Sequence, residues 1–384
     1  MKRSTDRILT THVGSLARPK ELLETMREKE NGRPYDRELF DEQVRVAVKD
    51  VVRHQAEVGL DVVADGEMGK VNFITYVAER LSGFDIEAGR STRQPSWQRE
   101  LDMFPEYYAE YFKKYSATAG PLHLMICRGP IEYVGQEAVA RDIANLKAAL
   151  AEVQVEEAFM PATSPRGFGG NEHYATEDEY ACAVADALRE EYRAIVAAGL
   201  ILQVDDPGLT EILSEDPDTT PEQRTKVAER HVEVVNHALR GIPEDRVRYH
   251  TCYGLNHGPR LHDVPLADVV PLMLRVNACA YSFEVANPRH QHEWRIWETQ
   301  KLPEGKALIP GFLSHAMNFV EHPELIADGI VQYADMVGRE NVLAGADCGF
   351  SSRASFAPEV HPSVAWAKFE ALAEGARLAT ARLW

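Results

Sequence analysis

Four side chains in this sequence have the types and spacing needed to bind one transition-metal ion. His250 and Cys252 are separated by one residue in VRYHTCYG. Cys348 ends the run NVLAGADC, and Glu284 ends the run AYSFE. Imidazole, two thiolates and a carboxylate form a tetrahedral set that suits zinc, because soft sulfur ligands disfavour magnesium and calcium. The spacing between the segments excludes a zinc finger. Two thiolates lower the Lewis acidity of the ion, which favours a bound sulfur nucleophile over activation of water.

The alternative interpretation is that His250 is a hydrogen-bonded core histidine and that the cysteines are small buried hydrophobic residues. An isolated His-X-Cys pattern is weak evidence for a metal, whereas a second cysteine at another strand end strengthens it. His290 and His292, in NPRHQHEW, are a rival pair, but their charged surroundings indicate solvated side chains. We interpret the remaining cysteines as packing residues: Cys127, Cys182 and Cys279.

Eight short apolar runs alternate with longer amphipathic stretches along the chain, as a (β/α)8 TIM barrel of the α/β class requires. Their high Val, Ile, Leu and Ala content is typical of parallel strands buried on both faces. The stretches 36–59, 177–199 and 220–241 have helical spacing and end at glycine, which favours the left-handed C-cap conformation. The predicted strands lie within residues 8–15, 60–67, 157–165, 200–208, 247–254, 280–287, 306–314 and 341–349.

A ninth apolar run, residues 122–134, is one more than the barrel needs. It follows an aromatic-rich segment, so we expect both to form an excursion after the second strand. The prediction is a single zinc-binding domain over residues 1–384, with a loop insertion at about 85–135.

Polar residues gather where the predicted strands end, and a barrel of this kind has its active site at those carboxyl ends. A buried polar group without a partner costs on the order of 1–3 kcal/mol, so a shared ligand or metal would explain them. The residues are His12, Ser15, Asp65, Glu67, Asp205, Asp206, His250, Cys252, Glu284, Asp347 and Cys348.

The charge balance argues against nucleic acid and anionic membranes as partners. Lys and Arg total 42 against 60 Asp and Glu, which gives a net charge of -18. The sequence has no signal-peptide pattern and no apolar run of membrane-spanning length. Five widely spaced cysteines do not indicate a disulfide framework, so we expect a cytoplasmic protein. A homo-oligomer is left open.

Several motifs resemble the cobalamin-independent methionine synthase family, specifically its catalytic C-terminal barrel. They run through most of the chain: TTHVGS, DGE, DDP, HTCYG, FEVAN and DCGF. The length leaves no room for the second, N-terminal barrel of the long family members, so the chain resembles the short, single-barrel branch. The resemblance implies that zinc is held by His250, Cys252, Glu284 and Cys348.

The resemblance also implies roles for four further residues. Ser15 in the Gly-Ser loop would hold the carboxylate of homocysteine, and Glu67 and Asp205 would hold its ammonium group. His315, in GFLSHAMN, matches the proton-donating histidine of the family. Without the resemblance, Glu67 would be interpreted as a helix cap, Asp205 as a residue that stabilises a loop, and His315 as a surface histidine. Asp206 stands where the family usually has Glu.

These observations predict a zinc-dependent thiol S-alkyltransferase, most simply one that methylates homocysteine from a methylated folate or a corrinoid donor. The alternative enzyme resembles epoxyalkane:coenzyme M transferase, although coenzyme M has no amine to pair with Glu67 and Asp205. An alternative of another class is a non-catalytic zinc- or thiol-binding protein. Within residues 90–120, aromatic and basic side chains would suit a pterin or simply pack the loop: Arg93, Trp97, Arg99, Tyr107 and Tyr108.

Overall fold

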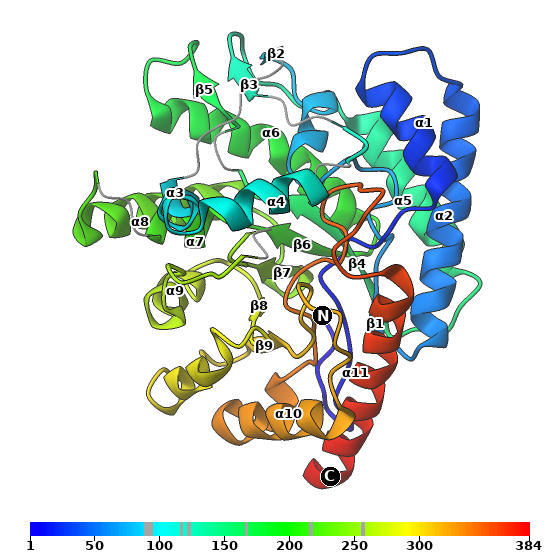
Figure 1. The fold of residues 1–384 in the computed structure, drawn as a ribbon, viewed down its shortest axis with the longest axis vertical. Helices are drawn as coiled ribbons and strands as arrows, with labels where there is room; N and C mark the ends of the chain where they lie inside the picture. Colours follow the sequence, from blue (N-terminus) through cyan, green and yellow to red (C-terminus); the bar gives the residue numbers. More distant parts are fainter. Residues whose placement is uncertain (88–94, 116–117, 121–123, 166–167, 215–217, 255–257) are drawn as a thin grey trace.

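A six-stranded sheet, in which every neighbouring pair is parallel, lies at the centre of the computed structural model (Figure 1). The structure describes residues 1–87, 95–115, 118–120, 124–165, 168–214, 218–254 and 258–384. Along the sheet the strands are β1 (Val62–Val63), β4 (Glu157–Thr163), β6 (Ile201–Asp205), β7 (Val247–His250), β8 (Ala280–Glu284) and β9 (Ala307–Gly311). Each lies within an apolar run that predicted a strand.

Two extended segments, residues 9–12 and 342–346, connect the two edges of this sheet. The first pairs with β1 and with the second segment, and the second segment pairs in turn with β9. Backbone pairing therefore continues from β9 through both segments to β1. The parallel bridges are Thr11 to Val62, Thr10 to Ala344, Leu308 to Val342 and Gly311 to Gly345.

The three predicted helices are confirmed as α2 (Arg37–Glu57), α6 (Glu177–Ala197) and α8 (Pro221–Ala238). Each begins after a side-chain N-cap and is followed, two or three residues beyond its end, by a glycine with positive φ. The other α-helices are α1 (Lys20–Glu30), α3 (Pro95–Met103), α4 (Pro105–Tyr115), α5 (Gln136–Leu150), α7 (Gly208–Leu213), α9 (Leu266–Met273), α10 (Pro323–Val337) and α11 (Pro362–Leu383). Short 3-10 helices are η1 (Thr75–Glu79), η2 (Glu244–Arg246), η3 (Gln291–Glu298) and η4 (Arg339–Asn341).

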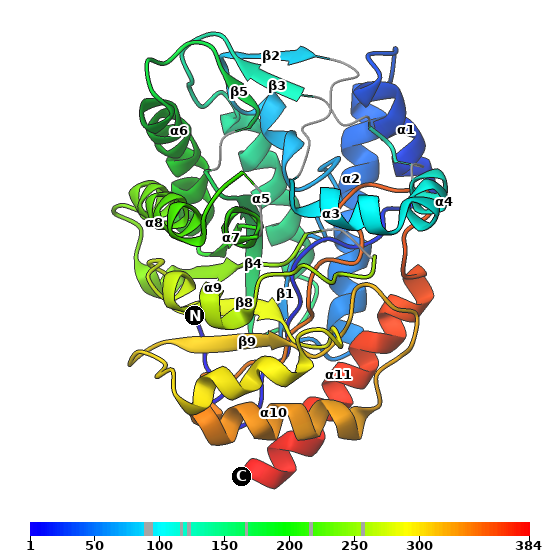
Figure 2. The ribbon, with the colours of Figure 1, turned by 60° about the vertical axis from the view of Figure 1, so that its left-hand side comes forward.

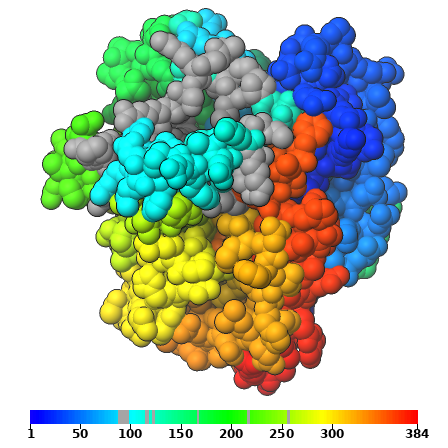
Figure 3. All heavy atoms as spheres, in the orientation of Figure 1, coloured from blue at the N-terminus to red at the C-terminus, as the bar shows by residue number. Residues whose placement is uncertain are grey.

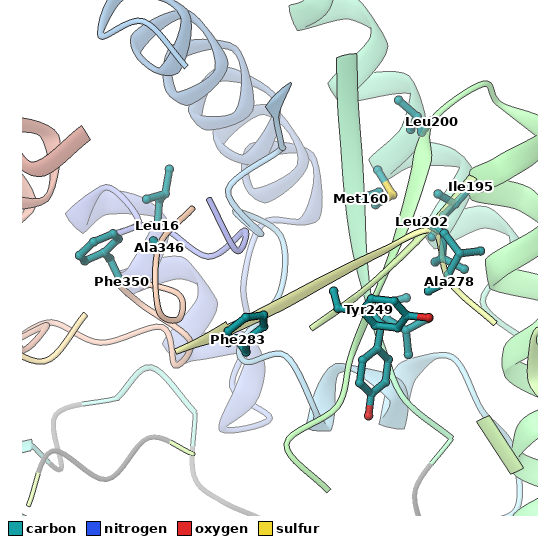
Figure 4. Packing of buried hydrophobic residues seen from close by; sticks show 14 of the residues in the cluster. Leu16, Met160, Ile195, Leu200, Leu202, Tyr249, Ala278, Phe283, Ala346 and Phe350 are labelled. Atoms are coloured by element: carbon teal, nitrogen blue, oxygen red, sulfur yellow. The ribbon is translucent and has the colours of Figure 1, made fainter. Parts of the chain in front are cut away.

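The helices that follow the strands cover the outside of the sheet (Figures 1 and 2), and successive ones pack on each other, as α2 does on α5 and α10 on α11. Alternate residues of a strand fall into separate clusters. Met160 and Leu202 join the large cluster with Ile195 of α6 (Figure 4), whereas Phe159 and Ile201 belong to a small cluster of their own. Both faces of the strands are therefore buried, as their continuous apolar composition predicted.

The segment after the second predicted strand contributes β2 (Phe84–Glu87) and β3 (Leu124–Cys127) to a separate three-stranded sheet, whose third strand, β5 (Gly170–Asn171), follows β4. Figure 2 shows it apart from the central sheet. Helices α3 and α4 cross the front of the molecule (Figure 3). Glu100 of α3 accepts a hydrogen bond from the Leu261 backbone N–H, and Tyr111 of α4 donates one to Glu359. The excursion thus lies over loops that follow β7 and the 342–346 segment.

None of the helices in the described part of the chain combines the length and apolar composition needed to cross a lipid bilayer.

Gly311, at the end of β9, allows the backbone before Cys348 to approach closely. A Cβ at this position would lie 2.4 Å from the backbone N of Asp347 and 2.5 Å from its Cα. Because backbone cannot move aside as a side-chain tip can, Gly311→Ala is expected to lower the free energy of unfolding by about 1–3 kcal/mol in urea denaturation.

The matched control is Gly170→Ala in β5, where the nearest atom to a new Cβ is an Ile126 methyl carbon at 4.0 Å. This variant is expected to keep its stability or to gain up to about 1 kcal/mol. Equal stability of the two variants would contradict the close approach at Gly311.

Candidate metal and substrate site

Side chains alternate between the two faces of β6 and β7, and those of Asp205 and His250 lie on the face that points to the interior. Arg248, two residues before His250, has its guanidinium carbon 3.9 Å from the centroid of the Phe159 ring. Ile201, four residues before Asp205, packs in the same internal cluster as Phe159. Because side chains two apart point the same way, both functional side chains face the interior at the carboxyl ends of β6 and β7.

His250, Cys252 and Cys348 converge, although Cys348 is almost 100 residues from the other two. Their ligand atoms all lie within 4.8 Å of one another, and each residue is at most 5% exposed. His250 Nδ1 lies 3.1 Å from Ser282 Oγ, while Nε2 has no hydrogen-bond partner among the described residues. An Nδ1–H that donates to Ser282 leaves the Nε2 lone pair available as a metal ligand.

The chemistry of this trio fits a soft divalent cation. Cys348, and then His250, lower the pKa of the Cys252 thiol to about 5 against the opposing effect of burial. Cys252 and burial in turn raise the pKa of Cys348. The two sulfurs therefore hold one thiolate charge between them, next to an imidazole nitrogen without a partner. A zinc ion would satisfy all three atoms at once.

Glu284 contacts the backbone of the residue that follows Cys252, but its possible ligand atoms form a second group with other residues. One of its oxygens, His315 and Asp347 offer ligand atoms within 4.8 Å of one another, and all three residues are buried. Glu284 Oε1 accepts a hydrogen bond from the Tyr253 N–H at 3.0 Å, and Oε2 lies 3.3 Å from Arg260 Nη1. Burial opposes ionisation, but Arg260 and then His315 lower the pKa of Glu284 to about 2. Glu284 is thus a carboxylate, held partly by an arginine.

Ser15 lies against the loop that carries Cys348. Its carbonyl accepts a hydrogen bond from the Phe350 N–H at 3.0 Å, and its Oγ is 3.2 Å from the Oγ of Ser352. A Cβ on Gly349 would lie only 1.9 Å from Ser15 Oγ. The loop that carries Ser15 and the loop that carries Cys348 are therefore in direct contact.

Glu67 and Asp205 are two buried carboxylates with raised pKa values. Burial raises the pKa of Asp205 to about 7, and the charge of Glu67 adds to this effect. Burial likewise raises the pKa of Glu67, whose Oε2 has no hydrogen-bond partner among the described residues and lies 4.0 Å from Arg18 Nη2. Glu67 also has a positive φ of 56°. A bound cation would stabilise both ionised carboxylates.

Asp206 serves the structure rather than the site. It is fully buried and pairs with His231 Nε2 and the Tyr249 hydroxyl, each at 2.6 Å, and with Ser164 Oγ at 3.0 Å. Against the effect of burial, His231 and these donors lower its pKa to about 2. His12, another strand-end residue, also has a structural role. Its ring contacts Gln55 Oε1 and accepts a hydrogen bond from the Gly14 N–H.

The expectation that His290 and His292 are both solvated is wrong for His290. Its ring is buried and paired with Asp263 at 3.0 Å and Glu293 at 2.7 Å, and it stacks on Tyr253 at 3.9 Å. The two carboxylates compensate for burial of a charged ring. His292 is exposed, as expected.

The remaining candidates differ in how far the structure describes them. Tyr108 is buried and donates to Glu100, and Tyr107 is 41% exposed and stacks on Tyr111. Arg93 and the Trp97 side chain lie outside the described residues. Cys127 is buried, and Cys182 and Cys279 are partly buried.

Two buried arginines belong to the site without any sequence motif to identify them. Arg18 is hydrogen-bonded to the carbonyls of Leu16, Glu67 and Lys70, and so connects the Gly-Ser loop to the Glu67 loop. Arg260 contacts Glu284 from a loop after β7.

The chain is similar in sequence to one family model and to several methionine synthases. The family model described as cobalamin-independent synthase, catalytic domain, matches residues 8–99. A methionine synthase from Saccharolobus islandicus is 23% identical over 372 residues, which is 96% of this chain and 94% of that protein. Another from Sulfolobus acidocaldarius is 27% identical over 249 residues, but the match spans only 61% of its length and 64% of this chain.

Two solved structures share the fold over nearly the whole chain. A B12-independent methionine synthase from Shewanella sp. W3-18-1, in complex with selenomethionine, has a TM-score of 0.71 and 19% identity, and the match covers 98% of this chain and 99% of that chain. A putative vitamin-B12-independent methionine synthase from Listeria monocytogenes has a TM-score of 0.66, with the same identity and coverage.

Proposed function

From its similarity to cobalamin-independent methionine synthases, we propose that this chain is a zinc-dependent methyltransferase that methylates the sulfur of homocysteine. The methyl donor is a methylated folate or a corrinoid. The observation that carries the proposal is the convergence of His250, Cys252 and Cys348 within 4.8 Å in the interior.

We infer that residues 1–384 form one (β/α)8 barrel domain with an insertion at about 85–135. The continuous backbone pairing from β9 through segments 342–346 and 9–12 to β1 supports an eight-stranded closed sheet. The separate sheet, of which β2 and β3 lie in this range, supports the insertion. The candidate residues then lie together at the carboxyl ends of the strands, where barrels of this kind carry out chemistry.

The proposed ligands of zinc are His250, Cys252, Cys348 and Glu284. Bound there, zinc would keep the thiol of the substrate deprotonated while its sulfur stays nucleophilic. The partnerless Nε2 of His250 and the charge shared by the two cysteines support the first three ligands. Glu284 would be the fourth ligand. It would bind zinc more weakly than the other three, because its carboxylate also contacts Arg260.

The side chains around this centre would bind and orient homocysteine. Ser15 would donate to the substrate carboxylate, and its contact with the Cys348 loop supports a position beside the sulfur site. Glu67 and Asp205 would hold the ammonium group, a cation that would favour the ionised form of both buried carboxylates. The substrate is thus held at three points, with its sulfur directed toward the cysteines.

His315 would donate the proton that the departing group needs. As the substrate sulfur forms its bond to the methyl carbon, the bond between that carbon and the donor breaks with its electron pair. A folate nitrogen then requires a proton. The burial of His315 beside Glu284 and Asp347 supports a controlled proton source at this place.

The direct test is product formation by the zinc-loaded protein. Homocysteine, coenzyme M and other thiols are incubated with methylated folate, methylcobalamin or an epoxide, and thioethers are measured by mass spectrometry. We expect methionine from homocysteine with one of the two methyl donors. A thioether from coenzyme M and an epoxide alone would support the alternative alkyltransferase, and no thioether from any pair would contradict the proposal.

Asp205→Asn is expected to weaken homocysteine binding by about 10- to 100-fold, because a charged hydrogen bond to the ammonium group is lost. Binding of 4-mercaptobutyrate, which is homocysteine without its amino group, should stay unchanged. The measurement is isothermal titration of each thiol into zinc-loaded protein.

The matched control is Asp335→Asn on the exposed side of α10, which should bind both thiols as the wild type does. An equal loss for both thiols in Asp205→Asn would mean that Asp205 acts on the site's structure and not on the amine.

A further inference from the structure

Arg260 is held in an unusual conformation beside the proposed metal ligand Glu284. It is 3% exposed and has a φ of 56°, in the left-handed region that non-glycine residues seldom occupy. Its Nε donates to Asp263 at 2.8 Å, and its Nη1 lies 3.3 Å from Glu284 Oε2. Its carbonyl accepts a hydrogen bond from Arg289 Nε at 3.2 Å. A strained, buried and charged residue with specific contacts on both sides is a candidate for function.

The surroundings of Arg260 are built to hold its guanidinium in place. Asp263, its second carboxylate partner, is also bound by His290, which pairs in turn with Glu293. The Tyr253 ring lies 5.3 Å from the guanidinium carbon and stacks on His290. Arginine stays charged even when buried, and its planar donors suit carboxylates. The cation facing Glu284 is therefore fixed by an anchored network.

Arg260 and the proposed metal ion would therefore compete for the negative charge of the Glu284 carboxylate. Oε1 accepts a hydrogen bond from the N–H of Tyr253, the residue after the trio member Cys252, whereas Oε2 faces Arg260. A carboxylate that shares its charge with arginine is a weaker donor to a divalent cation. A weakly held fourth ligand can be exchanged for an incoming thiol, whereas a strongly held one would close the site.

We propose that Arg260 is a positioning residue that receives the Glu284 carboxylate and so keeps one position on the metal exchangeable for the substrate thiol. This inference rests on the proposed zinc and thiol function. Replacement of Arg260 is therefore expected to raise the affinity for zinc and to lower the affinity for the thiol.

The test measures both affinities for Arg260→Gln. Zinc affinity, from competition with a chromophoric chelator, is expected to increase about tenfold, because Glu284 becomes a full ligand and a nearby positive charge is lost. Affinity of the zinc-loaded protein for homocysteine is expected to decrease about tenfold, because the thiol must displace a stronger ligand. A merely structural role would instead weaken zinc binding.

A Glu284→Gln background gives the matched control. There, adding Arg260→Gln should have far less effect on either affinity, since the carboxylate through which Arg260 acts is absent. If Arg260→Gln does not fold, as judged by circular dichroism, Arg260→Lys replaces it. Lysine keeps the charge but not the planar donors, so we expect the same directions of change with smaller size.

The outcomes separate this inference from the proposed function. A wild type that binds no zinc, or whose zinc responds to no thiol, contradicts the function itself. If the wild type binds both, unchanged or weakened zinc affinity in the folded Arg260 variant overturns the role of Arg260 alone. An undiminished effect of Arg260→Gln in the Glu284→Gln background also overturns it.

Discussion

Cys348→Ser is expected to lose zinc, with affinity falling by at least about 100-fold, beyond the effect of substitutions outside the direct ligands. Serine keeps the size of the side chain but replaces a soft thiolate by a hydroxyl that stays protonated at neutral pH. The other two members of the trio cannot compensate, because the three ligand atoms already share one compact space. Atomic emission after gel filtration measures the bound zinc.

Cys182→Ser is the control, because Cys182 is a partly buried cysteine of α6 away from the trio. It should retain one equivalent of zinc. A folded Cys348→Ser protein that also retains a full equivalent would contradict the assignment of Cys348 as a ligand.

His315→Asn is expected to lower turnover by about 100- to 10,000-fold, the usual contribution of a general acid. Asparagine can still form hydrogen bonds beside Glu284 and Asp347 but cannot transfer a proton. Zinc content and homocysteine affinity should stay close to those of the wild type, which separates a role in proton transfer from a role in binding. Steady-state production of methionine measures the loss.

The exposed His292 provides the control, and His292→Asn should turn over normally. If His315→Asn loses its zinc while it stays folded, His315 is part of the metal site and not the proton donor. Normal turnover in His315→Asn would exclude both roles.

The strands and the His250–Cys252 pair could be predicted because their signals are local, and Cys348 was added to the pair because it ends another predicted strand. Continuous apolar runs indicate strands buried on both faces, and the two-residue spacing of His250 and Cys252 fits one face of β7 and its extension. The helix ends could be predicted from Gly59, Gly199 and Gly241, which have the positive φ expected of glycines that follow a helix. Such features depend on few residues at fixed distances in sequence.

Other features depend on contacts that no local pattern contains. Asp205 and Asp206 are adjacent and chemically identical, yet only Asp206 meets His231 and Tyr249, because consecutive side chains leave the strand end in different directions. The contact of Arg260 with Glu284 joins a loop residue to the last residue of β8, 24 positions further along the chain. Burial of His290 likewise follows from partners in two separate segments.

The central claim is that two distant segments hold one zinc ion that a thiol substrate can reach, and the most direct measurement is zinc-edge X-ray absorption of the zinc-loaded protein. Without substrate, we predict two sulfur neighbours at about 2.3 Å, together with lighter atoms. Saturating homocysteine should add a third sulfur. A spectrum without protein sulfur, or one that homocysteine leaves unchanged, would contradict the account.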